Sequence, residues 1–166
     1  MQAAMRYLLA VTLLAFITPV TAVEPQRAIS RAIQLFEAAA PQLPRGLHGV
    51  DLGRYQAALT QGEGVALVTG ADPADRCARF AAYALLPPRN GVVQLVFCPR
   101  FHTGGNDALR ALTVLHEMVH VVAGPDECRA MAFAAAVEQA AGGTYTPVGA
   151  YWRANRCDES SFRLPR

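Results

Sequence analysis

Residues 108–122, ALRALTVLHEMVHVV, contain the pattern around which the rest of the chain is organised. Inside this stretch lies the motif His116-Glu117-Met118-Val119-His120, flanked on both sides by apolar residues. In a helix, residues four apart stack on one face, about 6 Å from each other. The stretch therefore predicts a largely buried helix that presents two imidazoles side by side.

Two histidines at this spacing can bind one Zn²⁺ through their ring nitrogens. Glu117 is then placed to act as the general base on a water molecule that the metal activates. His116, Glu117 and His120 would be costly to bury without a partner, and a metal ion supplies that partner. The motif predicts one catalytic zinc per chain. The alternative is a helix on which both histidines pack while Glu117 points to solvent.

Catalytic zinc sites use three protein ligands, so a third ligand is expected. Asp126 is the preferred candidate, because Gly124-Pro125 ends the helix and lets the chain fold back toward the metal. Its alternative role is the N-cap of a second helix. Glu127 is the alternative ligand; in the first turn of that helix it would otherwise interact favourably with the helix dipole.

Two further residues are candidates for the third ligand. Glu138 lies on nearly the same helix face as Glu127 but about 16 Å farther along the axis, so at most one of the two can reach the zinc. His102 precedes the motif helix and is otherwise a histidine in a surface loop. Tyr145 and Tyr151, near the C-terminal end, are candidates for stabilising the oxyanion, and packing is their alternative role.

The rest of the chain predicts an α+β domain. Helical periodicity covers 24–40, and an apolar run at 64–68 predicts a strand. Residues 77–86 and 92–101 are expected to pair as strands around a turn at 87–91. The strand before the motif helix would offer an exposed edge to an extended peptide. The fold class is therefore a small, mostly antiparallel sheet packed against the HExxH helix and a following helix, as one domain over 23–166.

The first 22 residues are typical of a signal peptide. Arg6 is followed by an apolar stretch of about ten residues, shorter than a membrane span, and then by the small-residue cleavage site Val20-Thr21-Ala22. The sequence predicts an exported protein, periplasmic or secreted, with no membrane span after cleavage. With 15 basic and 13 acidic residues and no basic stripe, nucleic acid is not an expected partner.

Four cysteines follow the predicted signal peptide, an even number that favours disulfides in an exported protein. Four cysteines allow three pairings. The favoured one joins Cys77 to Cys98, in successive strand-like segments, and Cys128 to Cys157, which would attach the C-terminal tail to a helix. Zinc coordination by these cysteines is the alternative, although the chain has no CxxC pair.

Two stretches of the chain resemble a known family. The run 92–101, VVQLVFCPRF, followed by the HExxH helix, resembles the deuterolysin-type metallopeptidases, the aspzincin group of zincins, which includes lysine-specific metalloendopeptidases. The resemblance covers 92–135. In that group a strand ending in Cys-Pro precedes the HExxH helix, and the third ligand is an aspartate in a following segment. The resemblance implies a zincin-like domain with Asp126 as the third ligand.

Together these observations predict an exported zinc metallopeptidase that acts on a protein or peptide substrate. Glu117 would be its catalytic base, and His116, His120 and Asp126 its metal ligands. One alternative is an extracytoplasmic interaction protein that binds zinc without catalysis. Another is an amidase that acts on cell-wall peptide, and a third is a helical hairpin over a sheet without any metal.

Overall fold

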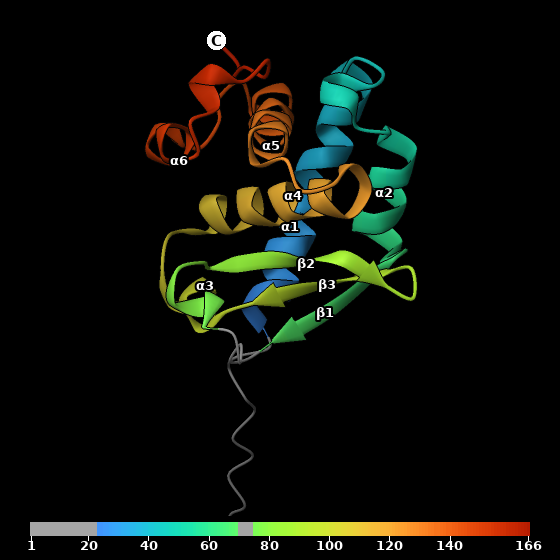
Figure 1. Ribbon diagram of the computed structural model, residues 1–166. Coiled ribbons are helices and arrows are strands. Elements are labelled where there is room, and N and C mark those ends of the chain that lie inside the picture. Colours follow the sequence, from blue (N-terminus) through green and yellow to red (C-terminus); the bar gives the residue numbers. More distant parts are fainter. Residues whose placement is uncertain (1–22, 70–74) are drawn as a thin grey trace, which may run out of the picture.

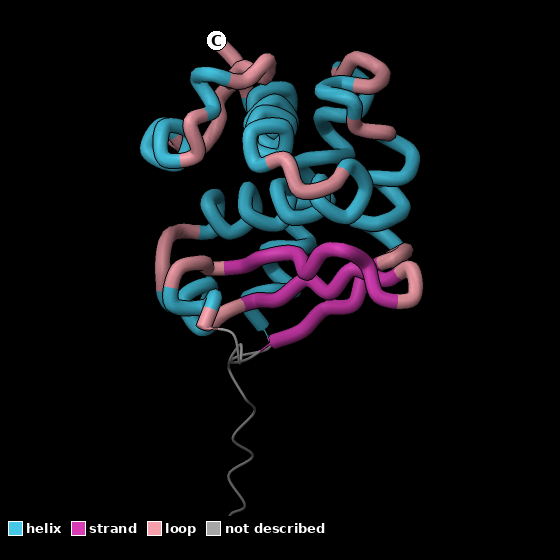
Figure 2. Tube along the Cα trace, in the orientation of Figure 1, coloured by secondary structure: helices cyan, strands magenta, loops and turns pink. Residues whose placement is uncertain are grey.

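The computed structural model describes residues 23–69 and 75–166 (Figure 1). The predicted signal peptide, 1–22, lies outside these residues. Most helices lie on one side of a three-stranded sheet, and the short helix Pro99–Thr103 lies at one end of the sheet (Figure 2). The predicted α+β class is therefore confirmed. Within the described ranges, every helix is too short or too polar to cross a membrane.

The helices and strands follow one another in an order close to the predicted one. In chain order they are α1 Val23–Ala39, α2 Leu52–Gln61, β1 Val65–Thr69, β2 Ala82–Arg89, β3 Val92–Phe97, α3 Pro99–Thr103, α4 Asp107–Ala123, α5 Glu127–Gly142 and α6 Gly149–Ala154. The predicted motif helix is α4, and the second helix is α5. The C-terminal residues contain a further short helix, α6.

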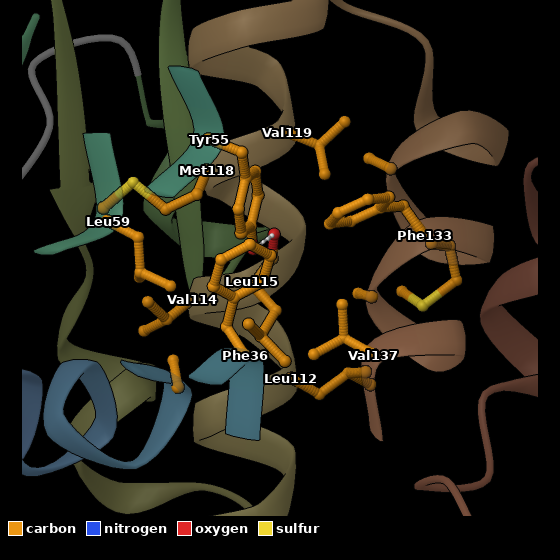
Figure 3. Packing of buried hydrophobic residues seen from close by; sticks show 14 of the residues in the cluster. Phe36, Tyr55, Leu59, Leu112, Val114, Leu115, Met118, Val119, Phe133 and Val137 are labelled. Atoms are coloured by element: carbon orange, nitrogen blue, oxygen red, sulfur yellow. Dashed lines mark hydrogen bonds between the residues drawn. The ribbon is translucent and has the colours of Figure 1, made fainter. Parts of the chain in front are cut away.

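Helix α4 is the central element, packed against α1, α2, α5 and β2. Its start is fixed by Asn106, whose side chain accepts a hydrogen bond from the amide of Leu109. Its apolar face is buried among side chains from α1, α2 and α5 (Figure 3). The Tyr55 hydroxyl donates a 2.8 Å hydrogen bond to the carbonyl of Leu115 within this core. The helix that carries the motif is therefore held on several sides.

The sheet has the strand order β1-β3-β2 and is mixed: β1 runs parallel to β3, and β2 runs antiparallel to it. The expectation that the strand before the motif helix offers an exposed edge is wrong, because β3 is paired on both sides. That strand also ends at Phe97, and Pro99 begins α3. Strand β2 lies at the edge nearest α4 (Figure 1).

The sequence holds signs of this strand order. The nearly continuous apolar run of β3, interrupted only by Gln94, is typical of a strand buried on both faces. Strand β2 contains Pro87-Pro88, and proline is confined mainly to edge strands because it cannot donate to a ladder. The turn to β3 is made by Asn90 and Gly91, both with positive φ, as in the tight turns that join hairpin strands.

Both predicted disulfides are confirmed: Cys77 bonds to Cys98, and Cys128 bonds to Cys157. The second one links the first turn of α5 to residues 144–166, which we call the C-terminal segment. Trp152 of this segment is buried, and its indole N–H donates a 2.9 Å hydrogen bond to Asp158. The C-terminal segment is thereby fixed beside α5.

Candidate metal centre

Three side chains from α4 and α5 converge on one point. His116 and His120 lie one turn apart on α4 and are only 4% and 5% exposed, while Glu127 is the first residue of α5. One donor atom from each of the three lies within 4.8 Å of the others. The Gly124-Pro125 turn brings the start of α5 back to the end of α4. Two helices joined by a tight turn therefore assemble a candidate metal centre.

The spacing of the three donor atoms fits a small divalent cation. The two Nε2 atoms are 3.2 Å apart, and Glu127 Oε2 is 3.0 Å from His116 Nε2 and 3.5 Å from His120 Nε2. Ligands about 2.0–2.2 Å from a tetrahedral zinc ion are separated by about 3.4 Å. Two imidazoles and a carboxylate are also a donor set that catalytic zinc uses. These residues fit the predicted cofactor.

The orientation of the His120 ring is fixed by a hydrogen bond on the side away from the other two donor atoms. Its Nδ1 lies 2.9 Å from the carbonyl oxygen of Gly124, which can only accept, so Nδ1 carries the proton and donates it. The lone pair of the neutral ring is then on Nε2, which faces the other two donors. Gly124 reaches this position with φ of 85°, a conformation that favours glycine. Such a carbonyl partner is typical of histidines that bind metals.

The geometry favours the alternative ligand, Glu127, over Asp126. Asp126 is the N-cap of α5, and its Oδ1 accepts a 2.9 Å hydrogen bond from the amide of Arg129. Its carboxylate is therefore used at the helix end. The next residue, Glu127, projects to the two histidines while its side chain keeps 44% of its surface exposed. The ligand assigned from the family resemblance is thus one residue away from the carboxylate that lies at the centre.

Tyr151 of α6 joins the centre, whereas Tyr145 does not. The Tyr151 hydroxyl donates a short hydrogen bond to Glu127 Oε2 and lies 3.4 Å from His116 Nε2. Burial, together with the negative charge of Glu127, raises the pKa of Tyr151 far above its usual value, so the phenol stays protonated. The Tyr145 hydroxyl instead lies 3.3 Å from the carbonyl of Pro165. Of the two tyrosine candidates, the structure brings only Tyr151 to the histidines.

The charge state of Glu127 reflects its three neighbours. Burial alone would raise its pKa, but hydrogen bonds with His116, His120 and Tyr151 bring the pKa of Glu127 well below its usual value. The carboxylate is therefore ionised. An ionised carboxylate beside two imidazole nitrogens is the charge arrangement that a divalent cation requires.

Glu117 is buried beside the two histidines. Burial raises the pKa of its carboxyl group, while the nearby His116 and His120 and a backbone hydrogen bond from Ala84 lower it; the net shift is upward. A carboxyl group with a raised pKa can take and return a proton near neutral pH. Its contact with Ala84 also shows that the outer edge of β2 faces the candidate metal centre.

A groove of about 240 Å³ runs between β2 and the candidate metal centre; we call it the β2 groove. Its lining combines residues 82–84 and Leu86 of β2 with Arg76, Phe80, Glu117, His120, Pro125, Glu127 and Tyr151. The role of β2 was not predicted from the sequence, because Pro87-Pro88 were assigned to the turn at 87–91. Strand β2 in fact extends from Ala82 to Arg89 and contains both prolines, which are typical of an edge strand. The strand that faces the centre is the one preceding β3.

Two other candidates lie elsewhere. Glu138 is buried, and its carboxylate accepts hydrogen bonds from the amide and the hydroxyl of Thr146, at 2.7 and 3.1 Å. It holds the C-terminal segment and is not part of the three-residue group. His102 lies on α3 and is likewise not part of that group.

Comparisons with protein-family models, with curated proteins and with solved structures find no match for this chain.

Proposed function

We propose that this chain is an exported zinc-dependent peptidase that hydrolyses peptide bonds in a protein or peptide substrate. The observation that carries the proposal is the convergence of His116, His120 and Glu127 directly beside the buried carboxyl group of Glu117. A purely structural zinc site is typically closed by four protein ligands, whereas a catalytic one uses three. The two disulfides are compatible with export.

The ligands in this proposal are His116 Nε2, His120 Nε2 and Glu127 Oε2. When bound there, zinc supplies a Lewis acid that activates water and polarises the substrate carbonyl. Glu117 accepts the proton that the water loses as it attacks the carbonyl carbon. The same carboxyl group then delivers this proton to the nitrogen of the leaving amine, so that one residue serves as base and acid in turn.

Tyr151 is assigned to the developing oxyanion. Its phenol remains protonated, and its oxygen lies within 3.4 Å of a ligand nitrogen, so it can donate a hydrogen bond to an oxygen at the centre. A hydrogen bond donated to the charge that develops on the carbonyl oxygen lowers the barrier. To do so, the hydroxyl exchanges its hydrogen bond with Glu127 for one with the substrate, while Glu127 binds the metal.

The edge of β2 is assigned to substrate binding. A strand at the edge of a sheet presents backbone N–H and C=O groups that can pair with an extended peptide. Residues 82–84 and Leu86 of β2 line the groove that also holds Glu117 and His120. A peptide paired with this edge would run past the zinc ligands, with one of its carbonyl groups facing Glu117.

The first experiment measures zinc and hydrolysis together on the chain 23–166. Wild type is expected to bind one zinc ion and to cleave a fluorescein-labelled unfolded protein. His120→Ala should lose the zinc. Glu117→Gln should keep it but cleave about 10³-fold more slowly, since it lacks the general base. Glu63→Gln, which makes the same change at an exposed position in the loop before β1, is the matched control and should behave like wild type.

Each contradictory outcome points to a different alternative. Zinc bound without any cleavage that depends on Glu117 would favour the interaction protein that binds zinc without catalysis. A chain that takes up no zinc after reconstitution with its disulfides intact would remove the metal from the proposal altogether. Cleavage confined to cell-wall peptide, with none of the labelled protein, would favour the amidase.

A further inference from the structure

A second cavity, of about 260 Å³, also borders the candidate metal centre. It lies among α4, α5 and α6, and we call it the apolar pocket. Its lining residues are Leu109, Leu112, Thr113, His116, Met131, Pro147, Val148, Ala150 and Tyr151. His116 and Tyr151 therefore belong both to the centre and to the wall of this pocket. Whatever occupies the pocket is next to the bond that the centre would hydrolyse.

The chemistry of the apolar pocket differs from that of the β2 groove. Its lining has no carboxylate and no arginine, whereas the β2 groove contains Glu117, Glu127 and Arg76. The hydroxyl of Thr113 already donates a 2.8 Å hydrogen bond to the carbonyl of Leu109. A charged occupant would lose water without gaining an opposite charge, which is costly. An apolar occupant is favoured instead.

The pocket has fixed walls and an open rim. Leu112, Met131 and Val148 are buried in the main core, so the walls are part of the packed interior. Leu109 is 40% exposed, and Ala150 is also exposed, so the pocket opens to solvent between them. Cavities that take whole small ligands measure roughly 300–1,000 Å³. This smaller one suits a single side chain.

We infer that the apolar pocket binds the side chain of the substrate residue beside the hydrolysed bond, and that it selects leucine, methionine or phenylalanine. The inference rests on the proposed function and names its substrate class. Neighbouring residues of an extended peptide are only about 3.3 Å apart. A peptide whose carbonyl lies at His116 therefore has a side chain within reach of a cavity that shares this wall. The lysine specificity of some members of the group that the sequence resembles is not expected here.

Binding to the metal-free protein tests the pocket independently of catalysis. The probes are two blocked peptides, acetyl-Gly-Gly-Leu-Gly-amide and the same peptide with lysine in place of leucine. The leucine peptide should shift the methyl NMR signals of Leu109, Leu112, Met131 and Val148, and should bind at least about tenfold more tightly than the lysine peptide. Equal affinities, or an absence of leucine-dependent shifts at these methyl groups, would overturn the inference.

A rim substitution adds a readout that a purely structural role would not give. Leu109→Glu puts a carboxylate at the mouth of the pocket, in the first turn of α4, where acidic residues are favourable, so the fold should be retained. The variant should lose its preference for the leucine peptide and bind the lysine peptide more tightly than wild type does. Leu67→Glu, on the exposed face of β1, is the matched control and should leave both affinities unchanged.

Cleavage sites in the zinc-loaded protein separate this inference from the proposed function. Mass spectrometry of a digested unfolded protein should find cleavage next to leucine, methionine or phenylalanine in wild type, and a shift toward arginine and lysine in Leu109→Glu. Cleavage without any such preference would overturn the inference about the apolar pocket and leave the proposed peptidase function in place. Leucine-dependent methyl shifts in a protein that cleaves nothing would retain the apolar site and overturn the peptidase.

Discussion

Helix α4 and the C-terminal segment both contribute to the candidate metal centre, but they are held in place differently. Helix α4 supplies two histidines and is surrounded by α1, α2, α5 and β2. The C-terminal segment supplies Tyr151, lies beyond α5 at the outer side of the helical layer (Figure 1), and is attached by the Cys128–Cys157 disulfide and by the contact between Glu138 and Thr146. The two histidines thus depend on the core for their position, and the tyrosine depends on a crosslink.

Shortening a core residue of α4 should have the largest effect on stability. Leu115 is fully buried, so Leu115→Ala should lower the free energy of unfolding by about 4 kcal/mol, because it removes apolar contacts and leaves a cavity. Urea unfolding measures the change. Leu67→Ala, at a position that is 50% exposed, is the control and should cost less than about 0.5 kcal/mol. Similar costs for the two variants would mean that α4 is not the central helix.

Removing the Cys128–Cys157 disulfide tests whether the C-terminal segment, unlike α4, depends on this crosslink. Its cysteines are 29 residues apart, and replacing both by serine should cost about 3.5 kcal/mol through the larger conformational freedom of the unfolded chain. Hydrolysis should fall while zinc is retained, since Tyr151 loses its attachment. The matched control removes Cys77–Cys98, whose separation of 21 predicts a similar stability loss. Because Arg76 and Phe80 lie near Cys77 and line the β2 groove, the two double variants are compared by kcat at saturating substrate. An equal loss of kcat in both, under conditions where both are folded, would contradict the link to Tyr151.

Removing the hydroxyl of Tyr151 tests its role at the oxyanion in a protein that should stay folded. Tyr151→Phe should lower kcat about 10²-fold, or about 2.7 kcal/mol in the barrier, because the oxyanion loses a donor. Zinc content should stay at the wild-type level. Tyr145→Phe makes the same change at a hydroxyl that contacts Pro165 and should leave kcat as it is. An unchanged kcat in Tyr151→Phe would assign the oxyanion to another donor.

Substitutions of the adjacent residues Asp126 and Glu127 should have different consequences, and the change in stability should be smaller than those above. Asp126→Ala should cost about 1 kcal/mol of stability through loss of the N-cap, and Asp126→Asn should restore it. Neither variant should lower zinc affinity, which calorimetry measures, whereas Glu127→Gln should. Loss of zinc affinity in Asp126→Asn would return Asp126 to the ligand position that the sequence favours.

The smallest effect concerns Glu138, which holds the C-terminal segment. Burial raises the pKa of Glu138 above its ordinary 4.5, and its hydrogen bonds with Thr146 only partly oppose this. The folded protein therefore binds the proton more readily than the unfolded chain does. The stability of wild type relative to Glu138→Gln should rise as the pH falls from neutral toward 4.5. Thermal unfolding at several pH values measures the difference in stability. A difference that does not change with pH would show that the pKa of Glu138 is not raised.

Much of the fold could be predicted because its signals are local. The Asn106 cap, the Gly124-Pro125 stop and the spacing of the histidines each depend on residues within one or two helical turns. The strand order could not be read from pairing signals alone, because the parallel contact between β1 and β3 joins segments far apart in the chain. The prolines of β2 were the one local sign of its edge position.

The sequence by itself determined helix α4, the two stacked histidines with Glu117 between them, and a limited choice of carboxylates and tyrosines. Only the tertiary structure decided among these candidates. Asp126 and Glu127 are neighbours, but an N-cap residue turns its side chain back to its own helix, while the next one projects outward. Tyr151 reaches the centre because a disulfide and the packing of Trp152 hold α6 beside α5. Helical spacing is set by backbone geometry, whereas such choices depend on contacts between segments that the chain brings together only when it folds.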